Sequence, residues 1–253
     1  MKKIIVITIF FCLSKVVVAQ KKIIFHYRNI ENLNGRTSDI KLEQYFCNGK
    51  SLEMPIVNKS LKNDSSYAED EMNRKKVIVD DLKRMPFILK LTDSTGLIYA
   101  ENIWLKNTFL AFDTLNNFNW KISNEKKKIN NEICTKAETD FRGRRYIAWF
   151  KKDNLTKVGP WKFGGLPGII FQVSDNENIY SYTLENIEYV DQFPVELKIP
   201  DAYANDEKIS HSTFISKWKA NKRDLEKDNN VVNYTLTGST NIKNIVAQIK
   251  ELY

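Results

Sequence analysis

Short segments rich in β-branched and aromatic residues, separated by turn signals, constrain the fold of this chain more than any other feature. Asn48-Gly49 is typical of a two-residue hairpin turn, and Asp93-Ser94-Thr95-Gly96 is a second group of turn residues. Turn signals at near-regular spacing favour an antiparallel sheet or a barrel. Residues 57–76 are polar and are predicted to form an exposed loop. The predicted strands span residues 23–28, 40–46, 87–91, 96–104, 108–112, 120–123, 129–136, 145–150, 169–173 and 179–190.

The hydrophobic period changes towards the C-terminus. Phe214, Trp218 and Leu225 fall on one helical face, and a second helical pattern follows in residues 242–252. Helices of this kind can cover the apolar face of an open sheet. The predicted fold class is therefore mainly β: an antiparallel curved sheet or half-barrel covered by C-terminal helices, which occupy about residues 210–253.

Residues 1–19 have the features of a secretory signal peptide. Lys2 and Lys3 precede an apolar run from Ile4 to Leu13, and small residues end the segment. A run of this length is too short to span a bilayer. We therefore predict that the mature chain, residues 20–253, is exported as a single β-rich domain. Its predicted location is the periplasm, the outer-membrane surface or the extracellular space.

Export also limits the partners. No later segment approaches the roughly eighteen uninterrupted apolar residues of a membrane span, so the mature chain is not predicted to cross a membrane. Removal of the leader lowers the formal charge from +8 to +5, since the leader holds three lysines and no acidic residue. Nucleic acid is a poor partner for an exported protein. The possible partners are therefore a lipid, a peptide or an outer-membrane protein.

Two cysteines remain after the leader is removed, Cys47 and Cys134. Exported proteins live in oxidising compartments, where a pair of cysteines invites a disulfide. The pair is therefore a candidate disulfide. The alternative is two separate buried thiols.

The central part of the chain carries an ordered set of short motifs. These motifs are Trp120-Lys121-Ile122, Cys134-Thr135-Lys136-Ala137, Phe141-Arg142-Gly143-Arg144, Ala148-Trp149-Phe150, Gly159-Pro160-Trp161-Lys162-Phe163 and Gly164-Gly165-Leu166-Pro167-Gly168-Ile169-Ile170. In this order they resemble the GLPGLI family of exported bacterial proteins, although the last motif here ends in two isoleucines. The resemblance implies export and a family whose function is uncharacterised. It implies no catalytic residues.

The glycines and the proline of the last motif have a backbone explanation. Leu166-Pro167-Gly168-Ile169 is predicted to form a type II turn, because Pro presets φ at the second position and Gly tolerates positive φ at the third. Such a turn would make a tight, buried corner that sets strand register. A rim that closes on a ligand is the alternative. A phosphate-binding loop is excluded, since no Lys-Ser or Lys-Thr follows the glycines.

Positive charge is concentrated between Lys121 and Lys162, which hold 12 basic and 5 acidic residues. The Arg142-Gly143-Arg144 turn is the densest point, and we expect it to lie near the segment 159–168. Two guanidinium groups beside aromatic surface would suit a ligand with an apolar body and an anionic end. The alternatives are a solvated strand face, an ion pair of Arg144 with nearby acids, and core packing of the aromatic residues. The candidate ligand-binding residues are Arg142, Arg144, Trp149, Trp161, Phe163, Gly165, Leu166, Pro167 and Gly168.

Enzyme signatures are missing from the sequence. It contains neither a G-x-S-x-G nor an H-E-x-x-H motif, and His26 and His211 lie at opposite ends of the chain. No catalytic residue, metal site or cofactor is predicted. The leading hypothesis is an exported non-enzymatic envelope protein that binds a hydrophobic or peptide ligand or docks on an outer-membrane partner. The alternatives are an exported hydrolase or peptidase with an unrecognised site, and a purely structural component of the envelope.

Overall fold

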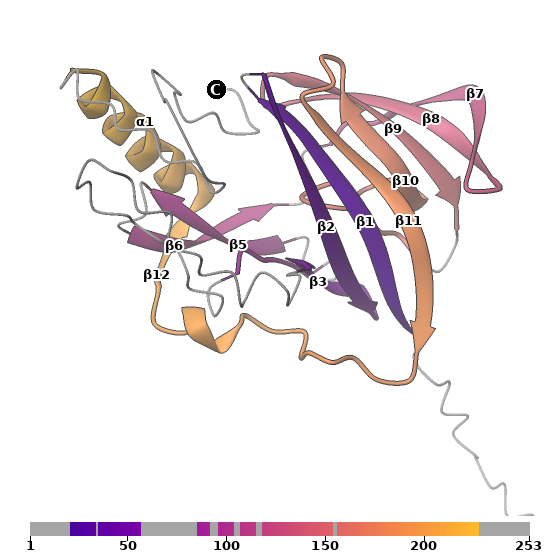
Figure 1. The fold of residues 1–253 in the computed structure, drawn as a ribbon, viewed down its shortest axis with the longest axis horizontal. Coiled ribbons are helices and arrows are strands. Elements are labelled where there is room, and N and C mark those ends of the chain that lie inside the picture. The colour runs from indigo at the N-terminus through magenta and orange to yellow at the C-terminus, as the bar shows by residue number, and fades with distance from the viewer. Residues whose placement is uncertain are drawn as a thin grey trace, which may run out of the picture.

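The structure is a computed structural model, and it describes residues 21–33, 35–56, 85–91, 96–103, 107–114, 118–153 and 156–227. Within these ranges, twelve strands form one sheet, and one α-helix, α1 (His211–Lys227), follows the last strand (Figure 1). The strands are β1 (Lys22–Leu33), β2 (Arg36–Cys47), β3 (Lys50–Pro55), β4 (Ile88–Leu91), β5 (Gly96–Ile103), β6 (Asn107–Thr114), β7 (Lys121–Ile129), β8 (Glu132–Phe141), β9 (Arg144–Lys152), β10 (Gly168–Asp175), β11 (Tyr180–Val190) and β12 (Glu207–Ser210).

The strand order is β12-β6-β5-β4-β3-β2-β1-β11-β10-β9-β8-β7. Most neighbours are consecutive in sequence and antiparallel, but β1 pairs with β11 and so joins two meanders. β12 lies parallel to β6, because residues 191–206 carry the chain from β11 along the sheet before it turns back (Figure 1). The mainly β prediction is confirmed. The sheet is mixed and not purely antiparallel, it is open, and the half-barrel stays a prediction.

Three two-residue hairpin turns connect neighbouring strands. Asn48-Gly49, Asn130-Asn131 and Arg142-Gly143 each have positive φ at both positions, between 45° and 81°, which is the geometry of type I′ turns. The hairpin predicted at Asn48-Gly49 is confirmed, and it leads into β3, for which no strand was predicted. The predicted strand 129–136 is wrong at its start, because Asn130-Asn131 is a turn between β7 and β8.

The main core lies between one face of the sheet and residues 156–168, which we call the inserted segment. Phe163 is 1% exposed, and its ring centroid lies 4.9 Å from that of Tyr146 in β9 and 6.1 Å from that of Tyr182 in β11. Trp161 and Leu166 are buried beside it. The inserted segment therefore packs as part of the interior of the protein.

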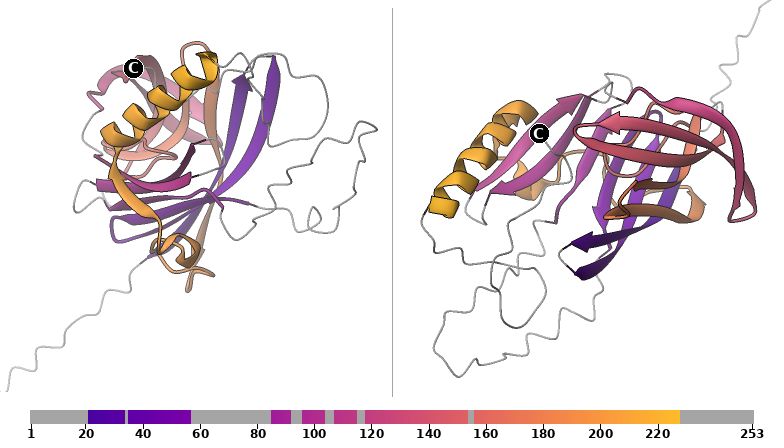
Figure 2. Two further views of the ribbon diagram at one scale, coloured as in Figure 1. Left: turned by 90° about the vertical axis from the view of Figure 1, so that its left-hand side faces the viewer. Right: turned by 90° about the horizontal axis from the view of Figure 1, so that it is seen from above.

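Two further segments cover the other half of the sheet. α1 packs its buried Phe214 and Ile215 against Leu97, Phe109 and other core residues of β5, β6 and β12 (Figure 2). The chain before β12 packs Tyr203 and nearby apolar residues against a separate core cluster of β3, β4 and β6. α1 lies where the first C-terminal helix was predicted, and a sheet covered by a set of C-terminal helices stays a prediction.

Several predictions fall outside the described residues. They are the signal peptide (1–19), the polar loop (57–76) and the second helix (242–252). Within the described ranges, no helix has the length and apolar character that a membrane span requires.

The turn at Pro167 differs from the predicted type II turn. The Gly168 N–H donates to the Leu166 carbonyl at 2.9 Å, which closes a three-residue turn around Pro167. Gly168 has φ 159°, far from the value near +80° of a type II turn. Glycine is required here for a different reason: an added Cβ would lie 2.0 Å from the Lys151 carbonyl oxygen. The corner is buried as predicted, but close approach of two backbones decides its residue type.

The predicted disulfide is not formed. Cys47 and Cys134 are both free thiols, and the four strands β1, β11, β10 and β9 separate β2 from β8 in the sheet. Neighbouring strands are about 4.8 Å apart, whereas disulfide-bonded Cα atoms lie within about 7 Å. Cys134 is fully buried, and burial raises the pKa of its thiol to about 11. The alternative of two separate thiols is therefore correct, but only Cys134 is buried, and Cys47 is partly exposed.

Candidate functional site

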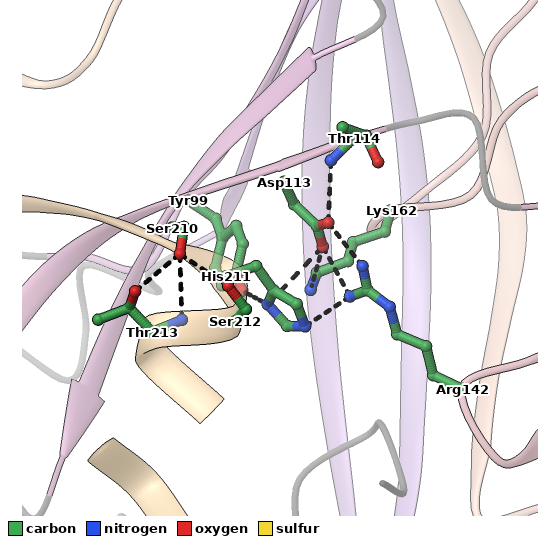
Figure 3. Close-up of polar contacts among 9 residues, drawn as sticks. All are labelled: Tyr99, Asp113, Thr114, Arg142, Lys162, Ser210, His211, Ser212 and Thr213. Carbon is green, nitrogen blue, oxygen red and sulfur yellow. Dashed lines mark hydrogen bonds and ion pairs between the residues drawn. The ribbon is translucent and has the colours of Figure 1, made fainter. Parts of the chain in front are cut away.

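A buried group of charged and aromatic side chains lies where the inserted segment meets β6 and the start of α1 (Figure 3). We call it the Asp113 cluster. Its members, from β5, β6, the β8–β9 turn, the inserted segment and α1, are Tyr99, Asp113, Arg142, Lys162 and His211. Eight strands lie between β6 and β8 in the sheet order, so the sheet must bend for these residues to meet.

Asp113 is the centre of the cluster. Arg142 donates from Nη2 to Asp113 Oδ1 at 2.6 Å and from Nη1 to Oδ2 at 2.7 Å, and Lys162 Nζ lies 3.1 Å from Oδ2. The Asp113 side chain is 4% exposed. Burial alone would raise the pKa of Asp113, but the hydrogen bond from Arg142 and the nearby positive charges of Lys162 and Arg142 outweigh it and hold the pKa below its usual value. The carboxylate is therefore ionised and shared by two cations.

His211 has a defined hydrogen-bonding pattern in the cluster. Arg142 Nη1 lies 2.6 Å from His211 Nε2, and a guanidinium can only donate. Nε2 is therefore the nitrogen without a proton, and Nδ1 carries the N–H. Nδ1 contacts the Tyr99 hydroxyl and lies 3.7 Å from Asp113 Oδ2. In this arrangement the lone pair of His211 is occupied, so the ring is not available as a free base.

Polar side chains of β2, β3 and β4 hold the backbone that presents Lys162. The Trp161 N–H donates to the two Glu53 carboxylate oxygens at 2.9 and 3.1 Å. The Gly159 carbonyl accepts from Gln44 Nε2 at 2.8 Å and also from Lys90 Nζ. Burial lowers the pKa of Lys90 to about 8, although Glu53 partly opposes this shift. Side chains of the sheet thus bind the main chain of the inserted segment. These hydrogen bonds hold the backbone next to Lys162 in place, and so they position its side chain.

The two predicted ligand-binding arginines point to different carboxylates. Arg142 lies in the turn and binds Asp113, whereas Arg144 begins β9 and pairs with Asp175 at 3.2 Å. Arg144 also lies over the Tyr180 ring, 5.1 Å from its centroid. Arg144 does form an ion pair, as the alternative stated, but with Asp175 and not with Glu138 or Asp140. The reason is that β9 places the Arg144 side chain on the buried face of the sheet. The two guanidinium groups therefore bind different carboxylates and are not arranged to bind one ligand together.

The predicted aromatic surface is divided between the two faces of the sheet. Trp149 and Phe150 lie on opposite faces, as their adjacent strand positions require: Phe150 is buried, and half-buried Trp149 has Lys127 Nζ 5.5 Å from its ring. Of the other candidates, Trp161, Phe163, Leu166 and Gly168 pack in the interior. These residues follow the core-packing alternative.

The structure also shows where the remaining candidate residues of the arginine turn and the inserted segment lie. The arginine turn and the inserted segment do lie together, since Arg142 and Lys162 share Asp113. Gly165 has φ +82° and lies beside Trp120, whose Nε1–H donates to the Gly164 carbonyl at 2.8 Å. Pro167 accepts the Asp153 N–H at 3.1 Å.

Sequence reasoning missed Asp113, Tyr99 and His211 as members of one site. His211 was set aside because no second histidine lies near it in sequence, and Asp113 ends a strand without any motif. One signal was available: Lys162 stands between two aromatic residues in a segment predicted to be buried, and a buried lysine needs an acidic partner. Among the described residues, no three His, Cys, Asp or Glu side chains come together in a way that could hold a metal ion.

A second group of cations lies on the edge strand β7. We call Lys121, Lys126, Lys127 and Lys128 the β7 lysines. All four are exposed, and none of them forms an ion pair with a residue that the structure describes. This edge therefore holds four cations of the basic segment 121–162 that no acidic group of the described chain neutralises.

Comparison with solved structures identifies a similar fold. Two structures of PNGF-II, in space groups C2 and P21, each have a TM-score of 0.51 and 14% sequence identity over 80% of this chain. This chain spans about a third of the length of PNGF-II, 33% and 34% in the two structures. At this identity the similarity concerns the fold alone.

Another similar structure is a putative outer membrane lipoprotein-sorting protein domain from Vibrio parahaemolyticus, with 8% identity and a TM-score of 0.31 over 73% of this chain and 89% of that one. This similarity is too low to support an argument. No protein-family model and no curated protein matches the sequence. The resemblance to the GLPGLI family therefore rests on the motifs.

Proposed function

We propose that this chain is an exported protein of the cell envelope, of the GLPGLI type, that acts by binding a partner or ligand and not by catalysis. The N-terminal leader pattern and the ordered motifs support export. The observation that carries the binding proposal is the set of β7 lysines, exposed cations without an acidic partner in the described chain. Such a surface favours association with an anionic group.

The Asp113 cluster supports a structural role for the most conspicuous charges. Its carboxylate is engaged by Arg142 and Lys162, and its imidazole by Arg142 and Tyr99. Groups that satisfy one another in this way connect separate parts of the fold. In this proposal the cluster holds the inserted segment and α1 on the sheet, and binding takes place elsewhere.

The test is to express the full chain in its own host, purify it from the envelope fraction, and record its intact and native masses. We expect a mature protein that begins at Gln20 or Lys21 and carries a partner or ligand. A retained leader would contradict export. A correctly processed protein that is always recovered bare would contradict binding.

A hydrolase or peptidase is the second candidate function, because the fold brings Asp113 and His211 within 3.7 Å. An acid beside a histidine is a common element of hydrolytic sites. A panel of ester and peptide substrates distinguishes the two functions, with Asp113→Asn and His211→Gln as variants. We expect no turnover above buffer from any of the proteins. Turnover by the wild type that both folded variants lose would favour the enzyme.

A further inference from the structure

The positive charge of β7 contrasts with the charge balance of its neighbours. In β8 and β9, Lys136 pairs with Glu138 at 2.9 Å and Lys151 with Glu132 at 2.8 Å, and Arg145 also pairs with Glu138. The one acid of β7, Glu125, is 3.0 Å from Lys136. Glu125, Glu132 and Glu138 thus pair with cations of β8 and β9, and none of the three pairs with a β7 lysine.

Exposed apolar residues lie among these lysines. Ile122 is 52% exposed and Ile133 is 60% exposed. Directly paired residues share one face of a sheet, and β7 pairs Ile122 with Ala137, Lys126 with Thr135 and Lys128 with Ile133. Because residues 133, 135 and 137 alternate along β8, both isoleucines lie on the same face as Lys126 and Lys128.

β7 is an edge of the sheet, so an extended acidic peptide is one conceivable occupant. The β7–β8 register shifts between Ile122 and Lys126, which marks a bulge in the edge strand. Bulges and edge lysines are features that oppose the addition of another strand. A lipid surface needs no strand register. Exposed isoleucines among lysines fit an interface that has an apolar layer below anionic headgroups.

We propose that the β7–β8 hairpin docks the mature protein on a bilayer that contains anionic phospholipids. Ile122 and Ile133 enter the boundary between headgroups and acyl chains, and Lys126 and Lys128 on the same face bind the headgroup phosphates. Exposed Lys121 adds to the positive charge of the edge. This inference rests on the proposed export and binding function, and it names the partner.

The experiment measures co-sedimentation of the mature protein with vesicles of phosphatidylcholine containing phosphatidylglycerol, and with vesicles of phosphatidylcholine alone. We expect binding to the anionic vesicles, weakened by salt. The test variant carries Lys121→Gln, Lys126→Gln and Lys128→Gln, and it keeps Lys127, which packs on Trp149. At about fivefold for each of the three surface lysines, its affinity should fall on the order of 100-fold.

Two further proteins make the test specific. A control with the same loss of charge carries Lys41→Gln, Lys50→Gln and Lys208→Gln, on strands remote from β7 in the sheet order, and should bind anionic vesicles nearly as the wild type does. Ile133→Ser should weaken binding roughly tenfold at unchanged charge, because it removes apolar surface from the interface. Thermal melting of each protein confirms an intact fold.

Three results would overturn the inference: no preference for anionic vesicles, equal losses in the β7 variant and the control, or tight binding of polyglutamate that Ile133→Ser leaves unchanged. The last would assign the hairpin to an acidic peptide. If the protein does not bind vesicles but its native mass shows another bound partner, the proposed binding function stands and only the membrane surface is ruled out as the partner.

Discussion

The basic segment 121–162 has two parts that use positive charge in opposite ways. In the interior part, Arg142, Arg144 and Lys162 have side-chain exposures of 15%, 5% and 4%, and each contacts a carboxylate. In the edge part, the β7 lysines are exposed and form no ion pair within the described chain. A count of charges along the sequence therefore does not show how positive the surface is, because some of the cations are buried and paired with carboxylates.

The interior cations connect elements that are distant in sequence. Asp113 brings β6 to the β8–β9 turn and to the inserted segment, and Asp175 at the end of β10 binds Arg144 at the start of β9. Buried charges of this kind tolerate desolvation only when they are paired. They therefore specify one arrangement of the fold, whereas the edge lysines form no ion pair within the described chain and remain accessible to a partner.

The largest expected effect is that of Asp113→Ala. The substitution leaves Arg142 and Lys162 without their shared carboxylate in a buried site, and such losses cost about 3–5 kcal/mol. Urea denaturation of the mature protein measures the free energy of unfolding. The double variant Asp113→Ala with Lys162→Met should recover part of the loss, since one stranded cation is removed. A loss too small to measure in the single variant would show that the interior cations do not need their partner.

Lys90 sharpens the comparison, because its hydrogen bonds go to the carbonyls of Gly159 and Phe163. Burial lowers its pKa in the folded protein to about 8, below the ordinary value of 10.5 for lysine. The unfolded chain therefore binds more protons between these values, and stability rises with pH through that window. The rise is on the order of 3 kcal/mol. Denaturation at several pH values measures it, and Lys90→Met should abolish it. Parallel pH curves for the two proteins would contradict the assignment.

Substitution of two glycines by alanine tests how closely the inserted segment approaches the sheet. Gly168→Ala places Cβ 2.0 Å from the Lys151 carbonyl oxygen, which belongs to a strand backbone and cannot yield easily. Gly159→Ala places Cβ 2.5 Å from Ile170 Cδ1, the end of a flexible side chain, and its nearest backbone atom, the Phe163 carbonyl oxygen, is 3.1 Å away. We expect Gly168→Ala to cost about 1–3 kcal/mol or more, and Gly159→Ala to cost less. Thermal melting ranks them, and the reverse order would refute the close backbone approach.

The smallest expected effect is that of Glu138→Gln, on the exposed face. Glu138 pairs with Lys136 and Arg145, and these surface ion pairs contribute little to stability. The melting temperature should stay unchanged within error. Binding to anionic vesicles should rise slightly, because two cations lose their acidic partner. A large drop in melting temperature would mean that the outer face, like the interior, depends on paired charge.

Local sequence determined much of the fold. Alternation and turn residues located most strands, Asn48-Gly49 predicted its hairpin, and the apolar face of Phe214 and Trp218 predicted α1. Adjacent positions in one strand placed Trp149 and Phe150 on opposite faces. These predictions succeeded because they depend on residues within a few positions of one another, where backbone preference and side-chain periodicity decide the structure.

Only the tertiary structure decided which distant residues meet. The sequence singled out Arg142, but its partners Asp113 and His211 lie 29 and 69 residues away. Their meeting requires β12 beside β6, β1 beside β11 and a bent sheet, none of which any short stretch of sequence encodes. The same strand order keeps Cys47 and Cys134 apart. Pairing of remote strands depends on how the apolar faces of the whole chain are buried together, so the partners of the charges follow from the completed fold.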